Sequence, residues 1–361
     1  MSLLNKLTII IPTYNRPHYI IRNILFWKDY DVNLIILDGS IEPLSKEVLN
    51  NISININYNY LPISFHERML KSIDLIKTKY SLLMCDDEFY LPTSLIYLLN
   101  QLECDNELVA CNGRAIAFKN NVNQITTRKE YIEMANYTIT HDSPVDRMLF
   151  HMKNYTCNNI YSIVRTPIWK DAMLIVSKTN DFTLFAIEEV IFELSVSFWG
   201  KSKVFPILFW LRSKENDGVS WNYRLPFHRW FKSKQKITEV NKFNNILLDA
   251  FRNSNLKDDD LMIYIKEASQ AFSLFSKNLY NDSIITNPIV YLGLRSPRFI
   301  KNTLGSIYKK IMNSPLFYKK QKEYTFYEPI KDLESEGVIV NYTDLHNIKE
   351  TLYKFHNLNI N

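Results

Sequence analysis

Four short apolar segments near the start of the chain, each followed by a polar or proline-containing turn, constrain the fold most strongly. They span residues 7–11, 33–37, 55–60 and 81–85. Stretches with helical character separate them, at residues 17–27, 64–79 and 92–102. Parallel strands cannot be joined by tight turns and need crossover connections, which are usually helices. The alternation therefore predicts an α/β fold with a mostly parallel sheet flanked by helices.

The polar residues that follow these strands are expected to form a ligand site. Residues 12–16, 38–40 and 86–88 each come directly after an apolar segment. In open α/β sheets, ligands bind in the crevice beyond the carboxyl ends of the strands. The three segments should therefore meet at one edge of the sheet.

Beyond this series the pattern becomes mixed and then mainly helical. A further strand is expected at residues 109–118, with helices at 144–152 and 185–198, and the sheet domain should end near residue 215. Residues 216–233 are expected to form a connecting loop; a lid over the ligand is the alternative, because the loop contains a glycine, an aromatic residue and cations. Residues 234–361 are expected to form a mainly helical region.

Composition excludes several classes of protein. The formal charge of +5, from 43 basic and 38 acidic residues, is too small to indicate a nucleic-acid binder. The four cysteines form no C-x-x-C pair, which favours a reducing compartment: Cys85, Cys104, Cys111 and Cys157. No apolar run approaches the roughly 18 to 20 residues that span a bilayer, and no signal peptide is visible. We expect a cytoplasmic protein whose membrane contact, if any, is peripheral.

The acidic triplet Asp86, Asp87 and Glu88 follows a buried-type strand and predicts a metal site. Mg²⁺ or Mn²⁺ prefers oxygen ligands and usually takes only one or two carboxylates, with water and phosphate oxygens in the other positions. The alternative is that the triplet serves the start of the helix near Pro92, where acidic residues favour the helix dipole.

Three motifs in this order resemble a known family. Residues 9–17 (IIIPTYNRP), 36–40 (ILDGS) and 85–88 (CDDE) are similar to the opening strand, the second nucleotide-contacting strand end and the D-x-D metal motif of family 2 and related GT-A glycosyltransferases. The resemblance covers about the first 120 residues well and continues less clearly to about residue 215. This chain has Leu37 where an aspartate is common, and Glu88 in place of the last aspartate.

The resemblance implies roles for individual residues in binding a nucleotide-diphosphate sugar. The family's donor-contacting positions correspond here to Pro12, Thr13, Tyr14, Arg16, Asp38, Arg68 and Asp86. Tyr14 would stack on the base, and Asp38 would accept a hydrogen bond from uracil or ribose. Arg68 would lie near the base and the diphosphate, since a guanidinium suits bidentate contact with phosphate. The alternative for Arg68 is a solvated helix charge.

Glu188 and Glu189 resemble the family's Glu-Asp segment, which supplies the general base of an inverting transfer. Neighbours on a helix point about 100° apart. In the helix expected at residues 185–198, the apolar stripe leaves Glu189 on nearly the opposite side and Glu188 on the flank. Glu189 is therefore the predicted base. The alternative is a pair of acids that serves the helix dipole. His66, His141 and His151 show no ligand spacing and are expected to be ordinary surface or core residues.

Residues 295–322 carry eight basic residues and no acidic one, with apolar residues at helical spacing between them. Basic amphipathic helices bind anionic membrane surfaces, so this segment predicts peripheral membrane contact. The outer face of a packed helix is the alternative.

Together these features predict a metal-dependent glycosyltransferase that acts on a glycan or lipid-linked saccharide acceptor with inversion. The expected donor is a UDP-sugar. A sugar-phosphate nucleotidyltransferase is one alternative, although the turn after the first strand lacks the glycine-rich loop of that class. A catalytically silent relative that binds nucleotide sugars is the other.

Overall fold

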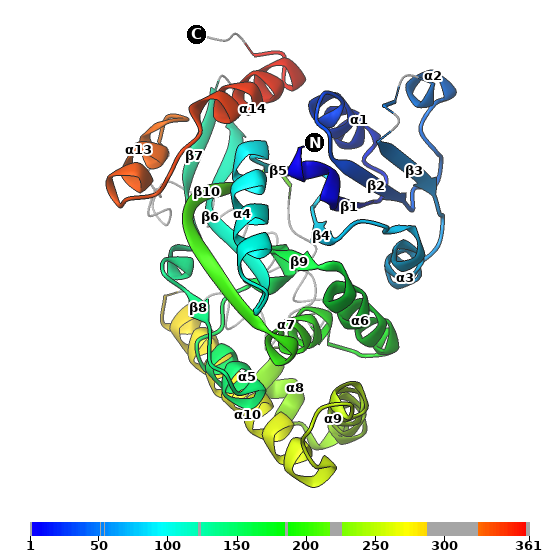
Figure 1. Ribbon diagram of the computed structural model, residues 1–361, viewed down its shortest axis with the longest axis vertical. Helices are drawn as coiled ribbons and strands as arrows, with labels where there is room; N and C mark the ends of the chain where they lie inside the picture. The colour runs from blue at the N-terminus through cyan, green and yellow to red at the C-terminus, as the bar shows by residue number, and fades with distance from the viewer. Residues whose placement is uncertain are drawn as a thin grey trace.

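The protein is described by a computed structural model that covers residues 2–50, 52–53, 55–121, 124–184, 187–216, 226–286 and 324–358. Within them, ten strands form one mixed sheet whose main order is β3-β2-β1-β4-β9-β6-β10-β5 (Figure 1). Short 3-10 turns occur at Leu3–Lys6, Ile132–Met134, Asn159–Tyr161, Ser177–Thr179 and Lys234–Lys236. The α/β class predicted from the sequence is therefore confirmed.

The first half of the sheet is the parallel unit predicted from the strand and helix alternation. Its strands are β1 (Leu7–Thr13), β2 (Asn33–Asp38), β3 (Ile56–Tyr60) and β4 (Tyr80–Leu83). They pair in parallel, β1 with both β2 and β4, and β2 with β3. The helices between them are α1 (Pro17–Trp27), the short α2 (Lys46–Leu49) and α3 (Phe65–Leu75). Pro17 pre-sets the first turn of α1, and Ser64 with Glu67 forms a capping box that starts α3.

The second half of the sheet contains more antiparallel pairing than the sequence pattern indicated. Its strands are β5 (Phe89–Tyr90), β6 (Leu108–Asn121), β7 (Gln124–Glu130), β8 (Thr138–Ile139), β9 (Ile163–Arg165) and β10 (Lys201–Ser213). Strand β9 runs antiparallel between β4 and β6, while β6 and β10 are parallel. Strands β5, β7 and β8 add antiparallel pairs.

The sheet separates two hydrophobic cores. Ile9 and Ile11 belong to one core and Ile10 to the other, as the two-residue period of a strand requires. The first core also takes residues from α1 and α4 (Pro92–Cys104). The second takes residues from α3 and from α5 (Pro144–Lys153), α6 (Thr166–Val176), α7 (Ile187–Trp199), α8 (Phe227–Lys232), α9 (Ile237–Phe251) and α10 (Asp258–Thr286). Both faces of the sheet are thus covered.

The described helices after residue 234 divide between these two cores. Helices α9 and α10 pack with α5, α7 and α8 at the lower end of the molecule in Figure 1. Helices α13 (Glu328–Ser335) and α14 (Tyr342–Phe355) return to the sheet, where α13 contacts β7 and α14 lies beside α1. Their apolar residues, such as Ile330 and Leu352, join the first core.

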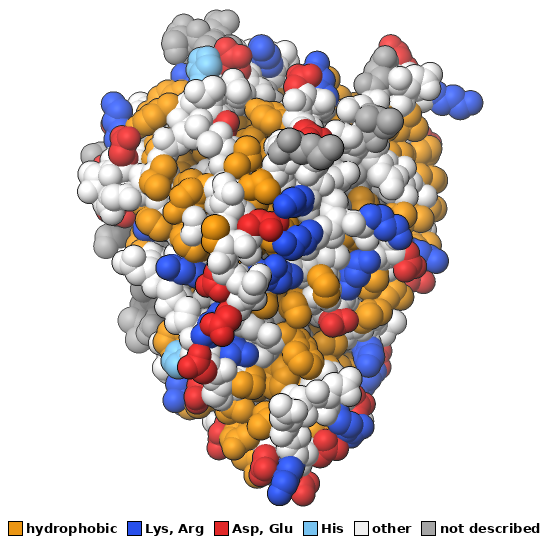
Figure 2. Space-filling model, viewed as in Figure 1, with side chains coloured by type: hydrophobic (Ala, Val, Ile, Leu, Met, Phe, Trp, Pro, Cys, Tyr) orange, Lys and Arg blue, Asp and Glu red, His pale blue; other side chains and the backbone are white. Residues whose placement is uncertain are grey.

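Figure 2 shows both signs of charge on the visible face, where Lys and Arg side chains near the middle have acidic side chains next to them. Among the described residues, no helix is both long enough and apolar enough to cross a bilayer.

Candidate functional site

The carboxyl ends of β1, β2 and β4 meet, as the sequence predicted. Thr13 ends β1 opposite Asp38, the last residue of β2. The Thr13 hydroxyl donates a hydrogen bond to Asp86 Oδ2 at 2.7 Å, and the Gly39 amide donates to the Thr13 carbonyl at 3.0 Å. All three predicted strand-end segments therefore contribute to one cluster.

Asp38 and Arg68 are both buried at this edge. Asp38 accepts hydrogen bonds from the Tyr58 hydroxyl at 2.6 Å and from the Ser40 amide at 2.9 Å. Arg68 Nη1 donates to the carbonyl oxygens of Thr13 and Leu37, at 2.5 and 2.8 Å. Because only 5% of Arg68 is exposed, the alternative of a solvated helix charge is wrong.

The Arg68 guanidinium explains why a glycine follows Asp38. A Cβ atom added to Gly39 would lie 2.5 Å from Arg68 Cζ, so any side chain there would displace the guanidinium. Arg68 Nε is buried and has no hydrogen-bond partner within the described structure. A buried unsatisfied donor is costly unless a ligand or water completes it. This donor fits a site that binds a polar or anionic group.

The turn after β1 presents Tyr14 to solvent. Tyr14 is 57% exposed, and the following residue, Asn15, adopts a left-handed conformation with φ of 54°. The Asn15 amide donates to Ser40 Oγ at 2.8 Å, and Asn15 Oδ1 accepts from the Ile41 amide at 3.0 Å. Pro12 lies within β1, opposite Leu37. The turn is therefore held to the end of β2 while the tyrosine ring remains accessible for stacking.

Asp86 and Asp87 both contact the guanidinium of Arg16. Arg16 Nη1 lies 2.9 Å from Asp86 Oδ1 and 3.5 Å from Asp87 Oδ2. Asn216 Nδ2 donates to Asp87 Oδ2 at 2.7 Å. Burial raises the pKa of Asp86, and the bonds from Thr13 and Arg16 oppose that rise. The arrangement keeps two carboxylates close together at the sheet edge.

Glu88 has different surroundings from the two aspartates. Its carboxylate accepts a hydrogen bond from Trp210 Nε1 at 2.8 Å and lies 3.8 Å from Arg212 Nε. Burial, followed by repulsion from Asp87, raises the pKa of Glu88 to about 8. The Trp210 ring stacks on Tyr161. Glu88 is thus bound to β10, and its role as a metal ligand stays a prediction.

The two candidate bases contact different partners at the start of α7. Glu189 accepts hydrogen bonds from the Tyr155 hydroxyl and the Cys157 thiol, and burial raises its pKa while both bonds oppose the rise. Glu188 Oε1 lies 2.6 Å from His66 Nε2, and this contact raises the pKa of His66. His66 is therefore no isolated surface residue, since its imidazole holds the flanking carboxylate.

A second buried carboxylate lies one turn further along α7. Glu193 Oε2 contacts His151 Nε2 at 2.8 Å, and Glu193 accepts the backbone amides of Asn159 and Ile160, each at 3.0 Å. The Tyr137 hydroxyl contacts His151 Nδ1 at 2.7 Å. This network joins α5, α7 and the turn at Asn159–Tyr161, so His151 is a core residue, as expected.

Helix α1 supplies contacts that sequence reasoning missed. Arg22 Nη2 donates to the Asp87 carbonyl at 2.7 Å, and Asn23 Nδ2 donates to the Asp86 carbonyl at 2.6 Å. Arg22 also pairs with Glu215 at 3.3 Å, and Glu215 contacts His356 just after α14. An arginine and an asparagine in an otherwise apolar part of α1 were the signal for these contacts. They hold the backbone of the acidic segment independently of its side chains.

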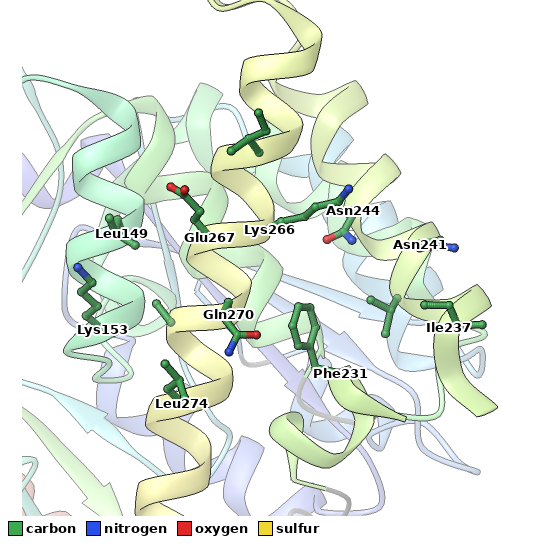
Figure 3. Close-up of a pocket in the computed structure, with 13 residues that line it drawn as sticks. Leu149, Lys153, Phe231, Ile237, Asn241, Asn244, Lys266, Glu267, Gln270 and Leu274 are labelled. Atoms are coloured by element: carbon green, nitrogen blue, oxygen red, sulfur yellow. The ribbon is translucent and has the colours of Figure 1, made fainter. Parts of the chain in front are cut away.

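A separate groove of about 870 Å³ lies between α5, α8, α9 and α10 (Figure 3). Apolar side chains such as Phe231 and Leu274 line it, together with Lys153, Lys266 and Glu267. Among its described lining residues are none of those predicted to bind donor, metal or acceptor.

The residues at the strand edge fit a metal ion only as part of a complex with a ligand. Among the described residues, no group of three or more His, Cys, Asp and Glu side chains is arranged to hold a metal ion. An ion that arrives with a diphosphate needs only one or two protein carboxylates, since phosphate oxygens and water fill its other positions. Asp86 and Asp87 meet that requirement.

Comparisons with known proteins show similarity in fold. No protein-family model matches the chain, and no curated protein matches its sequence. The structure of S. aureus TarS 1–349 in complex with UDP-GlcNAc aligns with a TM-score of 0.51 and 13% identity, over 98% of this chain and 93% of that one. The chain has a GT-A-like fold. TarS 1–349 alone and TarS 1–349 in complex with UDP each align with a TM-score of 0.42 and 13% identity, over 76% of this chain and 91% of that one.

Proposed function

We propose that this chain is a glycosyltransferase that takes a sugar from a nucleotide-diphosphate donor, expected to be a UDP-sugar. One observation carries the proposal. Four residues lie close together at the carboxyl edge of the parallel strands: Thr13, Asp38, Arg68 and Asp86. That edge is where open α/β sheets bind ligands. The TarS structure with the same fold holds UDP-GlcNAc, which is a donor of this chemical class.

In this proposal, different residues of the chain bind different parts of the donor. Tyr14 stacks on the base, Asp38 accepts a hydrogen bond from the nucleoside, and Arg68 supports the phosphate side through its guanidinium. Asp86 and Asp87 hold Mg²⁺ or Mn²⁺, which supplies positive charge to the leaving diphosphate. Arg22 and Asn23 fix the backbone that carries both carboxylates.

The acceptor is proposed to be a glycan or a lipid-linked saccharide. Its hydroxyl loses a proton as it attacks the anomeric carbon from the face opposite the diphosphate, which inverts that centre. Glu189 is the proposed proton acceptor. Its raised pKa suits this role, because a general base works best when its pKa lies near the operating pH.

A screen of nucleotides tests the proposal directly. UDP, GDP, CDP, ADP and dTDP, each with and without Mn²⁺, are added to the purified chain, and melting temperature and calorimetric affinity are measured. We expect a metal-dependent rise in melting temperature with one nucleoside diphosphate. If no nucleotide binds, the proposal fails. Binding without transfer or hydrolysis of any matching nucleotide sugar would favour the catalytically silent alternative, and formation of a nucleotide sugar from a sugar phosphate would favour the nucleotidyltransferase.

We expect Asp38→Ala and Arg68→Ala each to weaken binding of that nucleotide by about 10-fold or more, because charge-assisted hydrogen bonds to ligands are lost. Gly39→Ala should weaken it as well by displacing the guanidinium. Isothermal titration measures the affinities, and Lys71→Ala on the exposed side of α3 is the control. Unchanged affinity in all three variants would show that these residues are structural only.

The basic segment 295–322 lies outside the described residues, and its membrane role stays a prediction. We expect the chain to sediment with anionic vesicles and not with neutral ones, and to be released as salt rises, because surface charges are screened. Replacing the eight basic residues with glutamine should abolish sedimentation. Equal sedimentation with both kinds of vesicle would contradict the prediction.

A further inference from the structure

The side chain of Arg16 lies where a metal ion bound to Asp86 and Asp87 would also have to lie. Arg16 Nη1 is within 2.9 Å of one carboxylate and 3.5 Å of the other. The two carboxylate side chains are only 7% and 12% exposed, whereas the Arg16 side chain is 32% exposed. Two anions are held inside the protein, and the cation between them reaches in from the surface.

The Arg16 backbone is fixed at the start of α1, while its side chain is partly exposed. The Arg16 carbonyl accepts the amides of Tyr19 and Ile20 at the start of α1, which anchors the main chain. The guanidinium carbon also lies 5.9 Å from the centroid of the Tyr19 ring. Rotation about the side-chain bonds of Arg16 can carry the guanidinium away from the carboxylates while the backbone contacts to α1 remain.

Two oxygens of the pair also accept hydrogen bonds from neighbouring side chains. Asp86 Oδ2 accepts from Thr13, and Asp87 Oδ2 accepts from Asn216. Because Arg16 Nη1 contacts Asp86 Oδ1 and Asp87 Oδ2, the guanidinium competes with a divalent ion for Asp86 Oδ1 and for the space between the carboxylates. Two cations that share this space without an added anion repel each other strongly, because like charges in a partly buried site are poorly screened.

We propose that Arg16 takes the place of the metal in the free protein and moves to the diphosphate when the metal-bound nucleotide enters. The inference rests on the proposed function, since the diphosphate supplies the anionic group that receives the guanidinium. Arg68 lies at the same edge and has a buried, unpaired Nε, which suits the same anionic group. Metal and nucleotide then bind with positive coupling: each is weak alone, and each strengthens the other equally.

Mn²⁺ binding in the absence of nucleotide tests the proposal, with free Mn²⁺ measured by electron paramagnetic resonance. We expect Arg16→Gln to bind Mn²⁺ about 10-fold or more tightly than the unaltered chain, because the competing cation is gone. Arg16→Lys should resemble the unaltered chain. Arg252→Gln, which removes an exposed arginine just after α9, is the control for the loss of one positive charge.

Two further measurements make the result specific. Adding Asp87→Asn to Arg16→Gln should abolish the gain, which locates the ion at this carboxylate pair. The factor by which UDP tightens Mn²⁺ binding should be smaller in Arg16→Gln than in the unaltered chain. Equal or weaker Mn²⁺ binding by Arg16→Gln would overturn the inference. If Arg16→Gln gains Mn²⁺ affinity but no nucleotide binds to any variant, the proposed function fails while the competition between Arg16 and the metal stands.

Discussion

Asp87→Ala is expected to lower donor turnover by about 10³-fold or more while the fold survives, since a bound cation contributes several kcal/mol of transition-state stabilisation. The Asp87 side chain contacts Arg16 and Asn216 at the site. Its backbone carbonyl accepts a hydrogen bond from Arg22, and this bond does not depend on the side chain. The substitution thus removes a carboxylate and leaves the backbone contact. Hydrolysis and transfer of the nucleotide sugar are measured with added Mn²⁺, together with the melting temperature.

One further variant separates charge from shape, and another serves as a control. Asp87→Asn keeps the size and the contact with Asn216 but removes the charge, so it should be nearly as inactive as Asp87→Ala. Asp74→Ala removes an exposed carboxylate on α3 and should be fully active. Full activity of Asp87→Ala in the presence of a chelator would refute the metal assignment. Loss of activity with a melting temperature many degrees lower would instead indicate a structural role.

The largest effect expected on transfer alone comes from Glu189→Gln. This change keeps the shape and a hydrogen-bond acceptor for Tyr155 but removes the proton acceptor, so transfer should fall by roughly 10²-fold or more. Donor affinity should stay nearly unchanged. Glu188→Gln should do less, because its contact is with His66 at the start of α3. The reverse ranking would move the role to Glu188, and full activity of both variants would contradict the inverting mechanism proposed above.

The pH dependence gives an independent test of the same residue. Burial raises the pKa of Glu189, and only the ionised form accepts a proton, so transfer should rise with pH through that pKa. The Tyr155 hydrogen bond holds the pKa down. Tyr155→Phe removes this bond and should move the rising limb to higher pH while the rate at the plateau changes less. A profile that stays in place would show that Glu189 does not control it.

Much of the site at the carboxyl edge of β1, β2 and β4 was predictable. Local sequence patterns predict the elements, and the topology of parallel sheets predicts where their ends meet. Pro17 predicted the start of α1, and the apolar runs predicted the first four strands. Parallel strands connected by helices must end at the same edge, so Thr13, Asp38 and Asp86 had to approach each other. To predict this approach, it was enough to recognise that all three are polar residues at the ends of strands.

Contacts between distant elements were not predictable in the same way. Arg22 reaches the Asp87 carbonyl, His66 meets Glu188, and Trp210 binds Glu88, across separations of 65 to 122 residues along the chain. Nothing in the spacing of these residues indicates which pairs will meet. Arg68 was expected at this edge from the family resemblance, but its burial against Gly39 is a tertiary contact that no local pattern indicates.

The sequence by itself determined the α/β class, the order of strands and helices in the first half, and the edge at which the polar segments meet, because hydrophobic period, proline and capping residues act locally. Tertiary structure decided which carboxylates face which partners: Asp86 and Asp87 share Arg16, while Glu88 turns to Trp210. It also decided that α13 and α14 return to the sheet instead of staying with α9 and α10. Amphipathic helices carry an apolar face in every case, and only the available surfaces in the folded chain determine where that face is buried.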